Sequence, residues 1–431
     1  MRVLTCFCLL LLFIVTGVSA QDLGIFEETT AGNYFGFGAK QMAMGGTGIA
    51  NSIDGSALWY NPAGLARIPR IEFQLGMTHQ KFSNETSMPA GRYNPSFFKS
   101  TINSADTDAS KTRFSTVNLT IPVPTYRGAF VVSFGVHRML SFDRVGIFHV
   151  RDLRISDDAI VDDMTSESES GSVYMYSGGA AIDLSPNLSV GAALNVFSGE
   201  DKFVYTVSSL DETLIPLWSV SYSTQNVFDL IAIGGKTGLL YRPNNRTSIG
   251  LTIETPIYWE IEQRFTVDDT VTVVKYRLIH PFKFGAGMAM RFDKLRLAAE
   301  ATYADWSQLE YDDNPAMEQQ IDSLSDLYRA VVDLRLGVEY QFYKTGLALR
   351  GGIFSQPLPY DDKFIIDDNI GFTLGFGWLL DKTLLLEGAY VDGGLERTFT
   401  AFNADYTIPT NKNAIAEDRY RRVYLTVSYR Y

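Results

Sequence analysis

The sequence predicts an all-β protein: a transmembrane, antiparallel β-barrel of about fourteen strands whose lumen is plugged by an N-terminal hatch. Three observations support this fold. Apolar and polar residues alternate with period two along most of the chain, and the connections between these runs are alternately short and long. A glycine-rich, nearly uncharged stretch, residues 36–68, precedes the first run. We therefore divide the chain into a predicted signal peptide (residues 1–20), the N-terminal hatch (21–69) and the barrel (70–431).

Residues 1–20 have the pattern of a secretory signal peptide. Arg2 precedes an apolar run from Leu4 to Val15, and small residues end the segment at Val18–Ala20. Both cysteines, Cys6 and Cys8, lie within it, so we expect no disulfide in the mature chain. No later apolar run approaches twenty residues, so any crossing of a membrane requires a closed barrel.

The composition argues against a nucleic-acid partner and against an enzyme. Without Arg2 the chain has 36 basic and 49 acidic residues, a net charge of −13, which would repel phosphates. The sequence holds no GxSxG, HExxH or P-loop motif, so we expect no catalytic activity, no cofactor and no metal. Calcium binding by the acidic run around Asp157 and Asp163 stays open beside the simpler reading of a solvated loop.

Fourteen runs with period two predict the strands. In the first run, Ile71, Phe73 and Leu75 face one side while Glu72 and Gln74 face the other. Each run is about ten residues long, which suits a tilted strand that crosses a bilayer. The predicted strands are residues 70–82, 114–123, 129–142, 173–184, 188–197, 228–241, 247–261, 282–292, 295–306, 330–342, 347–354, 370–380, 383–391 and 421–431.

The connections indicate a bacterial outer-membrane barrel. The short ones, such as 185–187, 293–294 and 381–382, are turns of Pro, Asn, Asp and Lys, and the long ones are polar and acidic. Short periplasmic turns opposite long outer loops are typical of that class. The terminal aromatic residue, Tyr431, ends an alternating strand that barrel assembly machinery would recognise, and we expect a monomer surrounded by outer-membrane lipid.

The glycine-rich stretch predicts the hatch. A lumen of this width needs a plug or forms a pore, and glycine lets a plug bend sharply close to the wall. Pro62 fixes the backbone and biases Asn61 away from helix. Met42, Leu58 and Trp59 make the segment too apolar for a solvated periplasmic tether, which is the alternative reading.

The segment AMGGTGIANSIDGSALWYNPAGL resembles the N-terminal hatch of the FadL/TodX family of long-chain fatty acid outer-membrane transporters. AEATYADWSQLEY and LALRGGIFSQPLP are similar to later parts of that family. The resemblance implies a fourteen-stranded barrel with a hatch and passive uptake of hydrophobic compounds, from fatty acids to aromatic hydrocarbons. It also implies a kinked third strand with a lateral gap, reached by an Asn-Pro-Ala motif.

These implications select candidate residues. The gate would comprise Asn61, Pro62, Ala63 and Gly64 with Gly135, because glycine in a strand often marks a bend. An apolar substrate path would start in the third long loop and continue to the hatch: Phe203, Tyr205, Leu217, Trp218, Met42, Met44, Leu58 and Trp59.

Two inward-facing arginines could bind an acidic ligand. Arg335 and Arg350 lie on adjacent predicted strands, and an arginine fork suits a carboxylate. In the alternative reading they pair with Asp333, Glu339 or Glu387 and hold the wall. Arg138 has lipid-facing parity late in the third strand, which predicts a rim residue.

Two functions remain open on the sequence. The first is a hatch-gated transporter of hydrophobic small molecules. The second is a hatch-plugged barrel that serves as a docking or shuttle component of a protein secretion system. The acidic loops, which lack a long apolar segment, leave the substrate itself undetermined.

Overall fold

The computed structural model describes residues 36–87, 98–102, 105–154, 159–211, 218–267, 270–312, 328–359, 365–400 and 413–431. The predicted signal peptide, the first part of the predicted hatch and Leu217 lie outside these ranges. Among the described residues, no helix has the length and apolar character that crossing a membrane requires.

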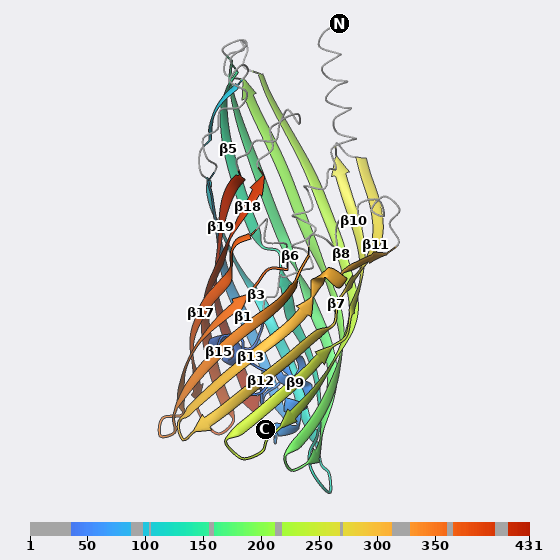
Figure 1. Ribbon diagram of the computed structural model, residues 1–431, viewed down its shortest axis with the longest axis vertical. Helices are drawn as coiled ribbons and strands as arrows, with labels where there is room; N and C mark the ends of the chain where they lie inside the picture. Colours follow the sequence, from blue (N-terminus) through green and yellow to red (C-terminus); the bar gives the residue numbers. More distant parts are fainter. Residues whose placement is uncertain are drawn as a thin grey trace.

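The strands form a closed, antiparallel barrel of 14 strands, which confirms the predicted fold class (Figure 1). The first and last strands pair with each other and close the ring. The ring runs in the order β1 (Glu72–Ser87), β3 (Ala105–Val123), β4 (Phe130–Ser141), β6 (Ala159–Ser185), β7 (Leu188–Asp211), β8 (Trp218–Tyr241), β9 (Thr247–Glu254), β12 (Lys283–Phe292), β13 (Leu295–Asp305), β15 (Ala330–Phe342), β16 (Leu347–Gln356), β17 (Ile365–Leu379), β18 (Leu384–Thr400) and β19 (Asn413–Arg430).

Five further strands extend the ring beyond the ends of its members. They are β2 (Phe98–Ile102), β5 (Arg144–Arg154), β10 (Ile257–Val267), β11 (Thr270–His280) and β14 (Glu310–Asp312), and η2 (Trp306–Gln308) precedes the last of them. β10 follows β9 after Pro256, and β12 follows β11 after Pro281. Proline has no N–H for the ladder, so each strand is interrupted there.

The alternation determines which side chains face outward. Phe73, Leu75 and Met77 of β1 are exposed by 45%, 46% and 51%, while Glu72 and Thr78 are buried. Similar outward apolar rows occur on β9, β15, β16 and β17. A wall of this kind is stable only when lipid covers its outer face.

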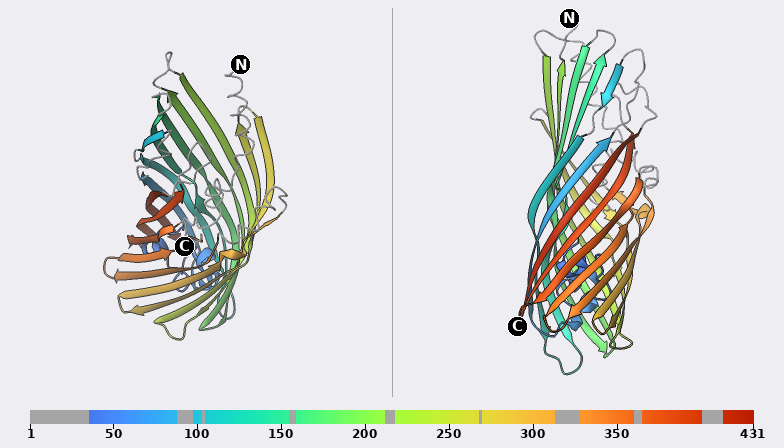
Figure 2. Two further views of the ribbon diagram at one scale, coloured as in Figure 1. Left: turned by 45° about the horizontal axis from the view of Figure 1, so that its top comes forward. Right: turned by 90° about the vertical axis from the view of Figure 1, so that its left-hand side faces the viewer.

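Acidic segments that we expected to be loops are largely strands. β6, β7 and β8 have 27, 24 and 24 residues and rise far above the rest of the ring (Figure 2). Phe203 and Tyr205 therefore lie within β7, and Trp218 is the first residue of β8, so the prediction of an apolar third loop was wrong. Outside a bilayer, strands can continue on backbone pairing alone, without the apolar alternation that marks a membrane-crossing strand.

The short turns gather at the end of the barrel that holds the C-terminus (Figure 2). In the turn before β18, the Asp381 carboxylate accepts hydrogen bonds from the Thr383 and Leu384 N–H groups and from the Thr383 hydroxyl, all at 2.7 Å. These bonds, the Thr383 N–H first, hold the pKa of Asp381 below its usual value. Aspartate is common in turns for this reason.

The closing strand gives the first prediction. Tyr429 pairs with Phe73 of β1 and with Leu384 of β18. Removal of Tyr429–Tyr431 therefore deletes the strand pairing that closes the ring at its lower edge. We expect this truncation to abolish outer-membrane insertion, measured as the loss of heat-modifiable barrel in membrane fractions. Removal of the same number of residues from the predicted signal-proximal segment, 21–23, is the control. Normal levels of folded truncated protein would contradict the prediction.

Candidate functional site at the hatch and the barrel wall

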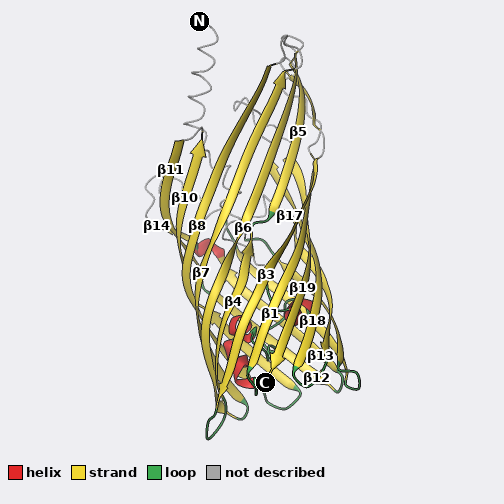
Figure 3. Ribbon diagram, turned by 180° about the vertical axis from the view of Figure 1, so that it is seen from behind, coloured by secondary structure: helices red, strands yellow, loops and turns green. Residues whose placement is uncertain are grey.

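The described part of the predicted hatch lies inside the lower half of the barrel (Figure 3). It contains α3 (Ala39–Ala43), α4 (Ala57–Tyr60) and η1 (Pro62–Arg67), joined by tight turns. These helices are too short to be stable alone, so their conformation depends on contacts with the wall. Most of residues 36–68 are buried.

Polar side chains of the wall accept hydrogen bonds from the hatch backbone. Glu300 Oε2 accepts the Gly48 and Ile49 N–H groups at 2.7 and 2.9 Å. The Thr373 hydroxyl accepts the Gly45 N–H at 2.9 Å, and Glu72 accepts the Gly55 N–H at 2.8 Å. The wall therefore satisfies donors of a segment that has little regular structure of its own.

Lumen-facing glycines of the wall also allow the hatch backbone to pack closely against the strands. A Cβ on Gly191 would meet the backbone of Pro62 and Ala63, and one on Gly352 would meet that of Gly45. Glycines 179, 238, 250, 285, 337 and 375 also face hatch atoms so closely that a Cβ would force a shift, and a Cβ on Gly287 would make a tight contact with Ile49. The inward glycine pattern on several strands is a sequence signal for the plugged lumen that we did not use.

The Asn-Pro-Ala motif lies against β7 and β8. Asn61 Oδ1 accepts the Ala63 N–H at 3.1 Å, while its Nδ2 donates to Ile49 O at 2.7 Å and to Leu239 O at 3.1 Å. Pro62 and Ala63 lie against Gly191 of β7, and a Cβ on Gly64 would meet Ser52 O. The motif thus joins two parts of the hatch to β7 and β8, while Gly135 lies in β4.

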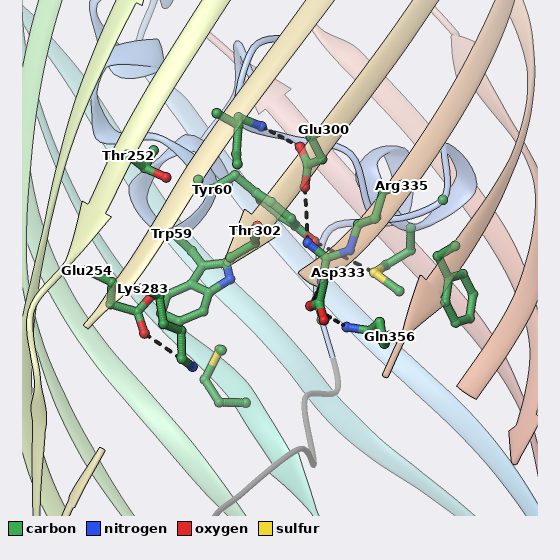
Figure 4. A pocket seen from close by; sticks show the side chains of 18 of the residues that line it. Trp59, Tyr60, Thr252, Glu254, Lys283, Glu300, Thr302, Asp333, Arg335 and Gln356 are labelled. Atoms are coloured by element: carbon green, nitrogen blue, oxygen red, sulfur yellow. Dashed lines mark hydrogen bonds and ion pairs between the residues drawn. The ribbon is translucent and has the colours of Figure 1, made fainter. Parts of the chain in front are cut away.

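A cavity of ≈ 110 Å³ lies between the hatch and the wall (Figure 4). Of the predicted substrate-binding residues, it is lined by Met42, Trp59 and Arg335. Met44 and Leu58 are fully buried in separate apolar clusters, and Arg350 and Phe203 do not line the cavity. The additional lining residues are Gly36, Gly45, Gly46, Ile49, Tyr60, Met139, Lys236, Thr252, Glu254, Lys283, Gly285, Glu300, Thr302, Asp333, Phe354, Gln356, Val391, Tyr420 and Arg422.

One end of the cavity holds two lysines around one glutamate. Lys236 Nζ and Lys283 Nζ lie 3.1 and 3.5 Å from the Glu254 carboxylate, and all three side chains are almost fully buried. The Lys236 ammonium also lies 4.0 Å from the centre of the Trp59 ring, within the range of a cation–π contact. This end of the cavity places two ammonium groups beside an aromatic face. A lone lysine inside the apolar run of β8 was the sequence signal for Lys236.

The two predicted arginines are engaged with acids of the wall. Arg335 donates to Glu300 at 3.1 Å and to Asp333 at 2.9 Å. Arg350 donates to Glu339 at 2.7 Å and lies 2.9 Å from Glu387. These ion pairs match the alternative reading, in which both arginines hold the wall, although Arg335 also faces the cavity.

The third strand bends later than we expected. Gly135 pairs regularly with Asn118 and Ser177, so the structure does not place a kink there. The register of β4 against β6 shifts between Arg138 and Leu140 instead. Arg138 is fully buried and not a rim residue, which corrects its predicted position. Its guanidinium donates hydrogen bonds to Ser172, Ser141 and Asp143, which hold the side chain within the wall.

The described residues contain no group of three or more histidine, cysteine or acidic side chains arranged to hold a metal ion. Asp157 and Asp158 of the acidic run lie outside the described ranges.

No protein-family model matches the chain, and no curated protein matches it in sequence. Solved structures are similar in fold. A Pseudomonas aeruginosa FadL homologue aligns with a TM-score of 0.65 and 17% identity, over 93% of this chain and 99% of its own. The P. putida toluene transporter TodX aligns with a TM-score of 0.58 and 15% identity, over 92% and 99%.

The Ralstonia pickettii toluene transporter TbuX gives a TM-score of 0.51 and 16% identity, over 92% of this chain and 98% of its own. Identities this low establish the fold alone. The chain therefore has the fold of the FadL and TodX barrels, as the resemblance of its glycine-rich motif implied.

Proposed function

We propose that this protein is an outer-membrane transporter through which hydrophobic small molecules pass by hatch-gated, passive diffusion. The observation that carries the proposal is the cavity between hatch and wall, because any molecule crossing the plugged lumen must pass the hatch. Apolar side chains of Met42, Trp59 and Phe354 line part of it. The FadL homologue and the toluene transporters among the structural neighbours support transport over the secretion role.

The charges of the cavity favour an acidic amphiphile over a neutral hydrocarbon. Four cationic residues (Lys236, Lys283, Arg335, Arg422) and three acidic ones (Glu254, Glu300, Asp333) line it. The ammonium groups of Lys236 and Lys283 could bind the carboxylate of an acidic ligand, whereas toluene has no charged group with which to pair. The apolar tail would then lie along Trp59. Ligand sites of this type combine an apolar lining with a few placed polar groups.

Uptake by cells tests the proposal. Labelled hexadecanoate and labelled toluene are supplied to a Gram-negative host that lacks its own transporters, with wild type, Trp59→Ala or no protein. We expect the wild type to increase hexadecanoate uptake, and Trp59→Ala to lower it about tenfold. The indole ring provides both an apolar contact for the ligand and the cation–π contact that positions Lys236.

Trp378→Ala is the matched control, because Trp378 faces outward from β17 and is 46% exposed. It should transport at the wild-type rate. Equal uptake with wild type and with empty vector would contradict the proposed function, and preference for toluene would replace the acid by a neutral aromatic substrate.

A further inference from the structure

The outward face of β19 changes along the strand from apolar to cationic. Its lower outward residues are apolar and between 36% and 48% exposed: Val423, Leu425, Val427 and Tyr429. The next two outward positions are Arg421 and Arg419, whose side chains are 45% and 55% exposed. β19 rises from the C-terminus, which lies among the short turns, so both arginines lie toward the opposite end of the strand (Figure 2). We call Arg419 and Arg421 the arginine pair.

The arginine pair lies at the upper boundary of the outward apolar band. Arg421 is ten residues before Tyr431. At about 3.3 Å per residue and a strand tilt of about 40°, this interval is about 25 Å along the barrel axis, the height of the lipid-facing band in such barrels. Beside it, the outward ring of Tyr390 packs against that of Phe372, with centroids 6.3 Å apart. Aromatic rings of this kind mark the interface between lipid tails and headgroups.

One carboxylate positions both guanidinium groups. Arg419 Nε and Arg421 Nε donate to the two oxygens of Asp392 at 2.9 and 3.3 Å. The Tyr390 hydroxyl donates to the same carboxylate at 2.9 Å, and the Asp392 side chain is only 9% exposed. Within the described part of the chain, Asp392 is the only acceptor of either guanidinium. The terminal N–H groups of both arginines therefore face their surroundings and not the protein.

The cationic band is narrow. Lys81 of β1 lies opposite Arg421 in the ladder and places a third cationic side chain beside the arginine pair. The next outward position beyond Arg419 is Glu417, which lies opposite Glu85 of β1. Acidic residues thus begin directly above the cations. The positive charge is confined to one level, which is the level expected for lipid headgroups.

The extended strands on another part of the wall show a different arrangement. There, Lys275 of β11 lies 2.7 Å from Glu262, and Arg264 of β10 lies 2.7 Å from Asp229. Each of these exposed cations has an acid of its own. The arginine pair instead shares Asp392, so these three side chains together keep one net positive charge.

We propose that the arginine pair binds a phosphate of lipid A, the phosphorylated glycolipid of the outer leaflet, while the acyl chains lie along the outward apolar rows of β19 and β1. This inference rests on the outer-membrane placement in the proposed function. It adds a lipid site on the two strands that close the ring.

The chemistry of the site favours lipid A over other membrane lipids. A guanidinium fork binds phosphate in two-point geometry. A phosphate monoester carries a charge of about −1.5 to −2 at neutral pH, whereas the phosphodiester of phosphatidylglycerol carries a single charge. Lipid A also joins its phosphates to several acyl chains, which matches a cationic band directly above an apolar row. The bound lipid would contact both β19 and β1 and so stabilise their pairing.

A lipid titration tests the site. The purified mature protein in mild detergent is titrated with lipid A, and bound lipid is counted by native mass spectrometry. We expect Arg419→Gln with Arg421→Gln to weaken lipid A binding about tenfold, because both charged forks are lost. Arg419→Lys with Arg421→Lys keeps the charge without the fork and should give an intermediate affinity. Unchanged affinity in the double glutamine variant would overturn the proposal.

Lys275→Gln is the matched control. It removes an equally accessible cation, 74% exposed, that has its own acid in Glu262. Its lipid A affinity should stay within about twofold of wild type, since an exposed, paired cation contributes little. An equal loss in this variant would mean that lipid A responds only to overall charge, which also overturns the proposal.

Three further probes need only the wild-type protein, so they decide the question even if the double variant fails to fold. Lipid A from which both phosphates have been removed should bind about tenfold more weakly than intact lipid A. Phosphatidylglycerol should also bind more weakly, and a large excess of inorganic phosphate should not displace lipid A. Equal binding of phosphatidylglycerol, or displacement by inorganic phosphate, would reject lipid A as the specific ligand.

The lipid site and the proposed transport can fail separately. Lipid A binding is measured without transport, and Trp59→Ala, which should impair uptake, should bind lipid A like the wild type. Binding of lipid A by a wild type that takes up neither hexadecanoate nor toluene would reject the proposed transport alone. Normal uptake without lipid A binding would reject the lipid site alone.

Discussion

Deletion of residues 21–69 is expected to convert the protein into an open channel with large, steady ion conductance. The fourteen strands enclose a lumen that their own side chains do not fill. The described hatch residues occupy it, through bonds such as those from Gly48 and Ile49 to Glu300. We expect conductance in planar bilayers at least about tenfold above that of the intact protein.

Deletion of residues 21–35 alone is the control, because it leaves all described hatch residues in place. Its conductance should stay near that of the intact protein. If the deletion of 21–69 conducted no better than the intact protein, the segment would not be the plug that limits ion flow.

Glu300→Ala is expected to loosen the hatch without removing it. The carboxylate accepts two hatch N–H groups and pairs with Arg335 at 3.1 Å. Its loss leaves two buried N–H donors unsatisfied, and the partly buried Arg335 guanidinium keeps its ion pair with Asp333. Breaking a buried pair of this kind costs about 3–5 kcal/mol. We expect a lower thermal midpoint in detergent and intermittent channel openings in bilayers.

Two variants calibrate this result. Glu300→Gln keeps one acceptor oxygen and should have a smaller effect than Glu300→Ala. Glu260→Ala removes an exposed carboxylate of β10 whose side chain is 74% exposed, and should leave both measurements unchanged. If Glu300→Ala matched Glu260→Ala, the bonds to Gly48 and Ile49 would not hold the hatch.

The site was only partly predictable from the sequence. Met42 and Trp59 line the cavity, as their place in an apolar, glycine-rich segment indicated. Lys236 and Glu254 were missed because single charged residues within strands carry no motif, and they are neighbours only through the pairing of β8 with β9. Phe203 and Trp218 were assigned to a loop because polar strand extensions lack the alternation by which we recognised strands.

The sequence by itself determined the class of fold, the direction in which most side chains face, and the positions of the turns. Each depends on local rules: side chains alternate along a strand, and Pro, Gly, Asn and Asp permit tight reversals. Phe73, Leu75 and Met77, for example, form an outward apolar row in β1, as the alternation in residues 70–82 predicted.

Only the tertiary structure decided where the register of the third strand shifts and how the hatch fills the lumen. The bend of the third strand lies at Met139 and not at Gly135, because a bulge is set by the register between two strands and not by one residue. Likewise, the Arg138 side chain does not face lipid but lies buried in an ion pair with Asp143. The inward glycines contact the hatch because the closed ring brings strands that are distant in sequence around it.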